Sequence, residues 1–209
     1  MTQSEQEVRI MTIDSGLGVA RQIFRVLIDP GHAPGNVNQG PTGYFEYEGM
    51  WALSNLLRKE LSEYGIRADL TRTEAANPTL TRRGQMARGY DMFISQHSNA
   101  HNGRVRGSEV FYSIHQPQNQ DEAALLAAET ARLMGNPNRG AKVKRSARGS
   151  WDHFTVIRKA VAAGCPRVFL IESGFHDNPT DEAWLKQDAN LKRLAEMQAR
   201  LLHRVLNPP

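Results

Sequence analysis

The chain has 209 residues, of which 40% are hydrophobic and 23% are charged, and its formal net charge is +4. This length fits one domain with a buried core, and the composition is that of an ordinary globular protein. No apolar run is long enough to span a membrane, and a single cysteine, Cys165, excludes an internal disulfide.

The first residues differ in character from the rest. Polar residues together with Gly16 and Gly18 in the stretch 1–22 predict a flexible lead or a short added strand, followed by one catalytic domain at 23–209. The start of the chain lacks the basic and apolar regions of a secretory signal. We therefore expect a protein that stays in the cytoplasm until it is released, or a secreted protein whose leader is missing from this sequence.

Apolar runs and helical patterns alternate after residue 23. Short apolar or alternating runs predict strands at 24–29, 66–71, 90–97, 107–114 and 167–172, with a short strand or turn at 154–157. Helical spacing and a helix-start pattern predict helices at 50–64, 80–88, 121–134, from 178–182 and, as one or two helices, at 185–206. The basic, glycine-containing segment 136–153 is expected to be irregular. This alternation predicts a single α/β domain with a twisted, mostly parallel sheet of about six strands and helices on both faces.

Three of the predicted strands end in side chains that suit a metal site. The first is followed by Pro30, Gly31 and His32, the third ends at His97, and the last ends at Glu172. Open α/β sheets keep their ligand sites at the carboxyl ends of their strands. Two histidines and a carboxylate should therefore meet at one edge of one sheet.

The motifs around these residues resemble a known family. They are Asp-Pro-Gly-His at 29–32, Ser-x-His-x-Asn at 95–99 and Glu-x-Gly-Phe-x-x-Asn at 172–178. In this order they resemble the zinc-dependent N-acetylmuramoyl-L-alanine amidases of the amidase-3 family, which includes autolysins and phage endolysins. The resemblance covers 24–206, nearly the whole chain. It departs from the family after the first histidine, where glycine is usual and this chain has Ala33, Pro34 and Gly35.

The resemblance implies a hydrolase that acts on peptidoglycan. The bond cleaved would be the amide between the lactyl group of N-acetylmuramic acid and L-alanine of the stem peptide, with water activated by Zn²⁺. His32 and His97 would be metal ligands and Glu172 the general base. The alternative for Glu172 is a strand-end carboxylate that caps a turn, but the apolar residues before it make an unpaired carboxylate costly there.

Two glutamates compete for the position of third metal ligand. Glu46 precedes Leu53 by nearly two helical turns, so it shares the buried face if the helix extends back that far. Glu48 points well away from that face. The family pattern, a ligand glutamate that opens the helix after the first loop, also aligns without gaps on Glu46. We therefore expect Glu46 to be the ligand, with Glu48 as the open alternative.

Three other residues near the predicted site have weaker assignments. Asp29 is placed to accept a hydrogen bond from a ligand imidazole, as carboxylates behind metal-bound histidines often do. Asn99 is placed to orient His97 or the loop after it. His176 either contacts substrate or is a surface or supporting residue, because the family does not require histidine there.

The basic excess of the chain is local. Five cationic residues lie in one short stretch, namely Arg139, Lys142, Lys144, Arg145 and Arg148. We expect them to hold the protein on an anionic cell wall, and the alternative is a solvated loop. No nucleic-acid-binding signature accompanies them, so nucleic acid is disfavoured as a partner.

The favoured interpretation is therefore a peptidoglycan amidase in the setting of a phage or prophage endolysin. One alternative is a zinc peptidase or amidase that acts on another cell-wall bond. The other is a non-catalytic wall-binding or nucleic-acid-binding domain that kept the fold, which the intact set of His32, His97 and Glu172 speaks against.

Overall fold

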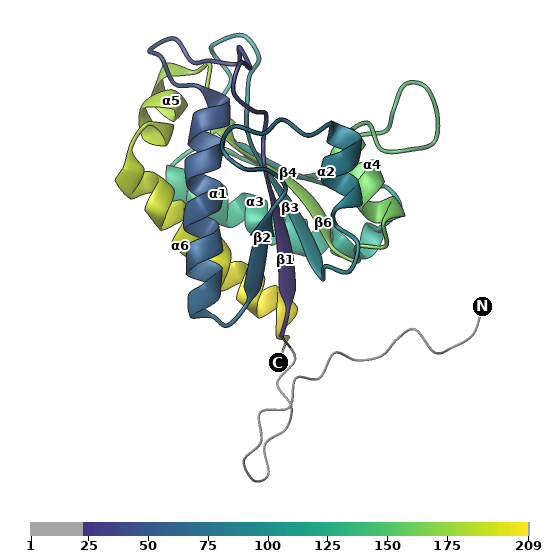
Figure 1. Ribbon diagram of the computed structural model, residues 1–209. Helices are drawn as coiled ribbons and strands as arrows, with labels where there is room; N and C mark the ends of the chain where they lie inside the picture. The colour runs from purple at the N-terminus through teal and green to yellow at the C-terminus, as the bar shows by residue number, and fades with distance from the viewer. Residues whose placement is uncertain (1–22, 209) are drawn as a thin grey trace, which may run out of the picture.

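The computed structural model describes residues 23–208, so the prediction for residues 1–22 lies outside the described residues. Its sheet has the strands β1 (Arg25–Pro30), β2 (Arg67–Leu70), β3 (Met92–Asn99), β4 (Ser108–Tyr112), β5 (Asn138–Lys142) and β6 (Val168–Phe175). Their order is β2-β1-β3-β6-β4-β5, and all neighbours are parallel except the antiparallel pair of β4 and β6 (Figure 1). The prediction of an α/β domain with a mostly parallel sheet is confirmed.

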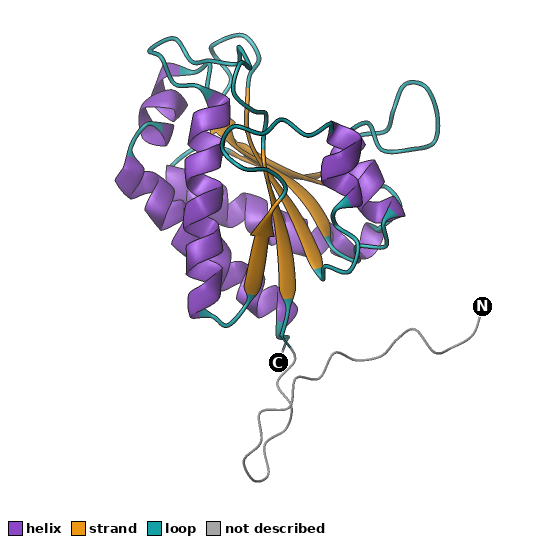
Figure 2. Ribbon diagram, in the orientation of Figure 1, coloured by secondary structure: helices purple, strands orange, loops and turns teal. Residues whose placement is uncertain are grey.

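Helices cover both faces of this sheet (Figure 2). They are α1 (Glu46–Glu63), α2 (Leu80–Gln85), α3 (Gln120–Met134), α4 (Thr155–Ala162), α5 (Pro179–Leu185) and α6 (Asp188–Leu206). Helices α1, α3 and α6 enclose the larger core cluster with Val26 and Ile28 of β1, whereas Leu27 belongs to the smaller cluster with α4. This alternation is expected of a strand that is buried on both faces. No helix within residues 23–208 is long and apolar enough to cross a membrane.

Helix α1 follows its predicted pattern. Met50, Leu53, Leu57 and Leu61 are fully buried on one face of it. Gly65 follows the last turn with a φ of 71°, a left-handed conformation in which glycine commonly ends a helix. Packing of this face fixes the rotation of the helix, and therefore the direction in which its first residues point.

Two segments differ from the prediction. The segment 136–153 was expected to be irregular, but it contains β5, a polar edge strand held by its parallel pairing with β4. Residues 154–157 were expected to form a strand or turn, but α4 begins at Thr155. Its β-branched residues Val156 and Ile157 favour strands in isolation, yet they are buried against the sheet as one face of a helix.

Candidate active site

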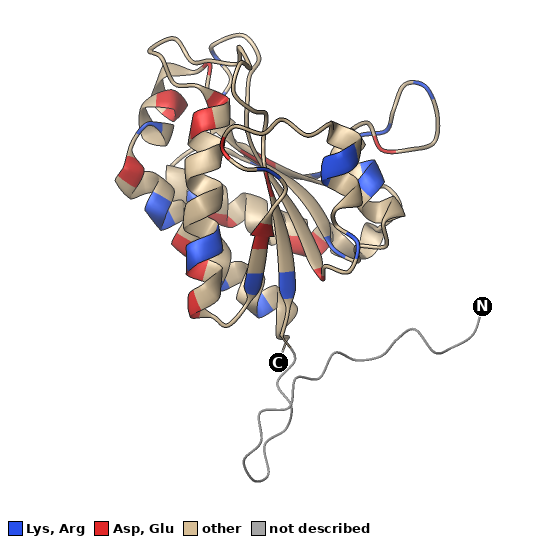
Figure 3. Cartoon of the chain, in the orientation of Figure 1, with Lys and Arg blue, Asp and Glu red and all other residues tan. Residues whose placement is uncertain are grey.

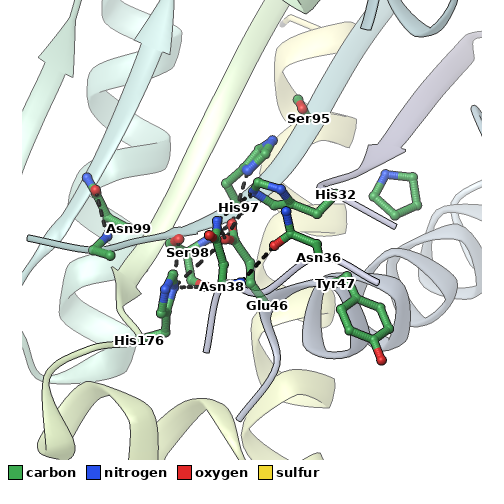
Figure 4. A network of polar contacts seen from close by, with 12 residues as sticks. His32, Asn36, Asn38, Glu46, Tyr47, Ser95, His97, Ser98, Asn99 and His176 are labelled. Carbon is green, nitrogen blue, oxygen red and sulfur yellow. Dashed lines mark hydrogen bonds and ion pairs between the residues drawn. The ribbon is translucent and has the colours of Figure 1, made fainter. Parts of the chain in front are cut away.

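The side chains of His32, Glu46 and His97 converge at the carboxyl ends of β1 and β3 (Figure 4). Nε2 of His32 lies 3.0 Å from Oε2 of Glu46, and Nδ1 of His97 lies 3.0 Å from Oε1 of the same carboxylate. One ligand atom from each residue fits within a group whose members are all within 4.8 Å of one another. The structure therefore brings together the two histidines and one of the two competing glutamates.

The turn after β1 places the two imidazoles side by side. Gly31 donates its backbone N–H to the carbonyl of Gln96 on β3 at 2.9 Å. A Cβ at Gly31 would lie 2.7 Å from Cε1 of His97, so only glycine leaves room for that ring. The next residue, His32, has a φ of 58°, which is uncommon for a residue other than glycine. The Pro-Gly-His sequence thus fits a tight turn against the neighbouring strand.

Glu46 is the first residue of α1 and is only 1% exposed. Besides the histidines, its carboxylate accepts hydrogen bonds from the backbone N–H of Ser98 at 3.1 Å and from the side-chain amide of Asn38 at 3.0 Å. Glu48 is exposed and accepts a hydrogen bond from the hydroxyl of Tyr47. The structure places Glu46 beside the histidines and Glu48 on the outer side of the helix, as the helical spacing predicts.

The charges of these groups are coupled. Burial would raise the pKa of Glu46, but hydrogen bonds from His32 and His97 outweigh burial and hold that pKa well below its usual range. Burial would likewise lower the pKa of His97, but the hydrogen bond and the charge of Glu46 outweigh it and raise the pKa to about 9. In the absence of an ion, the carboxylate and imidazole are therefore held together as a charged pair.

Glu172 lies on β6 and is the Cα partner of His97 across the pair of strands. It is 8% exposed, and its Oε2 has no hydrogen-bond partner in the part of the chain that the structure describes. Burial raises the pKa of this carboxyl to about 8, with the charge of His97 opposing the rise and that of Glu46 adding to it. A buried carboxylate with an unsatisfied oxygen is costly unless it has a ligand or a chemical task.

Glu172 and the three converging residues line one cavity of about 390 Å³. Its wall also contains apolar side chains, among them Leu80, Phe154 and Leu170. A cavity with a mostly apolar wall and a few converging polar groups is the usual form of a substrate site. We call this cavity the active-site cleft.

Asp29 does not make the contact that the sequence predicts. Its carboxylate accepts hydrogen bonds from Thr71 at 2.5 Å and Ser95 at 2.8 Å, and it pairs with Arg83 at 3.1 Å. Neither imidazole of the site donates to it among the described residues. The expected hydrogen bond is not formed because Thr71, Ser95 and Arg83 bind the carboxylate, although Asp29 lines a pocket together with His32 and His97.

Arg83 connects that buried carboxylate to the site. It is 2% exposed, and its guanidinium donates to the carbonyls of Pro30 and His32, both at 2.7 Å. These hydrogen bonds hold the turn after β1, in which His32 has a left-handed backbone conformation. The sequence contains no local signal for this role, since the short polar helix that contains Arg82 and Arg83 has no apolar periodicity to mark its buried side.

Replacing Arg83 with methionine is expected to destabilise the fold by about 3–5 kcal/mol, because it leaves Asp29 buried without its partner. The neighbouring Arg82 is exposed, so Arg82→Met is the matched control and should change stability by less than about 0.5 kcal/mol. Urea unfolding of both variants measures the difference. Equal stability of the two would show that the Arg83 contacts contribute nothing net.

Asn99 and His176 are placed beside the site. Asn99 donates to Glu109 at 3.1 Å and lines the active-site cleft, but makes no hydrogen bond to His97 among the described residues. His176 is buried, and its Nδ1 donates to the carbonyl of Ser98 at 2.9 Å. The same atom lies 3.9 Å from Oε2 of Glu46. His176 is therefore a supporting residue behind Glu46 that also reaches the wall of the cleft.

The donor set suits a metal ion. Two imidazole nitrogens and one carboxylate, with space beside them in the cleft, match the composition of catalytic zinc sites that use two histidines and a glutamate. The hydrogen bonds from Asn38 and Ser98 to Glu46 hold the carboxylate in place, as supporting contacts around metal ligands do. Sequence reasoning missed Asn38, which lies in a loop without a periodic pattern.

A family model described as N-acetylmuramoyl-L-alanine amidase matches residues 26–204 of the chain. No curated protein matches it by sequence. The fold of this chain is similar to that of Cwp6 from Clostridium difficile, with a TM-score of 0.80 and 23% identity. The match covers 88% of this chain but only 30% of the Cwp6 chain. It is similar to the catalytic domain of CwlV, an N-acetylmuramoyl-L-alanine amidase from Bacillus (Paenibacillus) polymyxa var. colistinus, with a TM-score of 0.75, 22% identity and coverage of 90% and 100% of the two chains. For the N-acetylmuramoyl-L-alanine amidase AmiC2 of Nostoc punctiforme the TM-score is 0.70, the identity 26% and the coverage 88% and 97%.

Proposed function

Because this chain belongs to the N-acetylmuramoyl-L-alanine amidase family, we propose that it cleaves the amide between N-acetylmuramic acid and L-alanine of peptidoglycan with the help of a zinc ion held by His32, Glu46 and His97. The observation that carries the proposal is the convergence of these three donors next to a buried glutamate with an unsatisfied oxygen. When bound, zinc polarises a carbonyl and lowers the pKa of water toward about 7.

The residues of the chain divide the remaining work between them. In its ionised form, which a cation held next to it would favour, Glu172 accepts a proton at Oε2 from the attacking water and returns it to the amine nitrogen of L-alanine as the C–N bond breaks. The products are the lactyl carboxylate and a stem peptide with a free amino group. The apolar wall of the cleft, including Phe154 and Leu170, limits the water around the reacting atoms and so strengthens the electrostatic interactions there.

Metal analysis tests the proposal directly. The purified protein is expected to hold about one zinc per chain, since three protein ligands with an open position form one site. Chelation should stop the release of L-alanine amino groups from peptidoglycan, and added zinc should restore it. Full activity after verified metal removal would contradict the assignment of the metal.

The biological setting stays a prediction. An endolysin that is released from the cytoplasm is one of the settings in which this activity is used, and secretion with a separate leader is the other. Localisation of the protein in its own cell, before and during lysis, distinguishes the two.

A further inference from the structure

A hairpin of residues 143–152 projects from the domain between β5 and α4 (Figure 1). An antiparallel bridge joins Arg145 and Asp152. The backbone N–H of Ser146 donates to the carbonyl of Trp151, and that of His153 donates to the carbonyl of Lys144, both at 2.8 Å. We call this segment the basic hairpin.

The structure divides the five clustered cations into two groups. Arg139 and Lys142 are both bound to the buried carboxylate of Glu109, at 2.6 Å and 2.5 Å, so its single negative charge offsets part of their two positive charges within the fold. The other three lie on the basic hairpin, are exposed, and pair with no acidic side chain among residues 23–208; they are Lys144, Arg145 and Arg148. Figure 3 shows the cationic tip of the projecting loop.

The base of the hairpin is fixed to the domain. Its only acidic residue, Asp152, is 1% exposed and accepts hydrogen bonds from the hydroxyl of Ser113 and the backbone N–H of Ile114. The carbonyl of Asp152 accepts a further hydrogen bond from Arg158 at 2.7 Å. Because its acidic group is consumed inside the fold, the exposed part of the hairpin carries positive charge alone.

The hairpin also adjoins the cleft. Lys144 lies over the ring of Phe154 at 5.4 Å, and Phe154 lines the active-site cleft together with Glu172. Trp151 is 40% exposed and adds an apolar surface next to the cations. A polymer that enters the cleft therefore has this cationic and aromatic surface within reach.

We propose that the basic hairpin binds the carboxylates of stem peptides in peptidoglycan. While one stem peptide lies in the cleft, the hairpin binds neighbouring stem peptides of the same polymer. The inference rests on the proposed function, which supplies a polymer of repeated peptides with free carboxylates. Exposed cations attract carboxylates over about 10 Å at 0.1 M salt. Each exposed ion pair contributes little binding free energy alone. A polymer with repeated carboxylates can form several such pairs at once, which raises its affinity. The partner is thus the substrate polymer itself.

The test is binding to purified peptidoglycan sacculi by the full chain carrying Glu172→Gln, so that the polymer stays intact. Replacing Lys144, Arg145 and Arg148 together with glutamine should weaken binding roughly tenfold at low salt. The loss should shrink as salt rises, because salt screens exposed charges. A matched control replaces three exposed cations of α1 and α6, namely Lys59, Arg193 and Arg200, and should bind as the parent does.

Two treatments of the sacculi identify the partner. Amidation of the peptide carboxylates should reduce binding of the parent to the level of the hairpin variant, whereas removal of phosphate polymers should leave the difference between them intact. If the parent and the hairpin variant bound equally after phosphate removal, the partner would be a phosphate polymer and the proposal would be overturned. Equal binding by the hairpin variant and its control, or a larger effect of the hairpin on binding to duplex DNA, would also overturn it.

A short soluble muramyl peptide separates this inference from the proposed function. Such a substrate fills the cleft without reaching Arg145 and Arg148. Lys144 is left in place in this test because it lies against Phe154 of the cleft wall and its charge acts on Glu172. The double variant of Arg145 and Arg148 with Glu172 intact should therefore cleave it at the rate of wild type. Failure of wild type to cleave it would count against the proposed amidase site. Slow cleavage by this double variant, with normal cleavage by wild type, would place the effect of the hairpin in the cleft and overturn the docking role. Thermal unfolding of each variant verifies that it folds.

Discussion

Glu172→Gln is expected to lower the rate of amide cleavage by at least hundredfold while the protein keeps its zinc and its fold. General acid–base groups contribute on the order of 10²–10⁴-fold to turnover, and glutamine has the shape of glutamate but cannot accept the proton. Oε2 of Glu172 accepts no hydrogen bond from residues 23–208, so the substitution breaks no hydrogen bond at that atom. Zinc content and the release of L-alanine amino groups are measured on the same preparation.

Glu109→Gln provides the matched control for this prediction. Glu109 is the antiparallel Cα partner of Glu172 on β4 and is also buried, but its carboxylate is bound by Arg139 and Lys142. Its replacement should change turnover by only a few-fold, because no step depends on it. Loss of zinc from Glu172→Gln would make Glu172 a metal ligand instead, and an unchanged rate in the zinc-loaded variant would remove its assignment as general base.

The elements that could be predicted from the sequence are those whose burial leaves a local pattern. Strands β1, β3 and β6 lie inside the sheet and are covered on both faces, so each is a continuous apolar run that ends at a turn. The apolar stripe of α1 likewise specifies which of its first residues faces inward. The two histidines, Glu46 and Glu172 could be proposed together because they lie at the ends of these well-marked elements.

The elements that could not be predicted depend on contacts between distant segments. Strand β5 is polar and exists because β4 offers it a ladder of hydrogen bonds at the sheet edge. The partners of Asp29 come from residues 42 to 66 positions away, and Arg83 acts on carbonyls more than 50 positions before it. The division of the basic stretch also required the fold, since nothing in the sequence indicates that Glu109 binds Arg139 and Lys142. Such pairings are set by the order of the strands rather than by local periodicity.

Glu46→Gln is expected to weaken zinc binding by more than the 10–100-fold that loss of a supporting residue typically costs, because Glu46 contributes a ligand atom itself. Glutamine keeps the size of the side chain and one oxygen, so the hydrogen bond from the backbone of Ser98 can remain. The neutral amide no longer offsets the charge of the metal or orients both histidines. Activity should fall with metal content, unlike in Glu172→Gln.

Zinc-dependent stabilisation measures this effect without reference to activity. A ligand present at a hundredfold excess over its Kd stabilises the folded state by about 2.7 kcal/mol, so wild type should unfold at a higher temperature in zinc than in chelator. This shift in unfolding temperature should nearly vanish in Glu46→Gln and persist in Glu48→Gln. Glu48 is exposed, and within residues 23–208 its side chain forms a hydrogen bond only with Tyr47. If Glu48→Gln lost the shift and Glu46→Gln kept it, the ligand would be Glu48. If both kept it, zinc would bind away from the two histidines and the carboxylate that converge at the ends of β1 and β3.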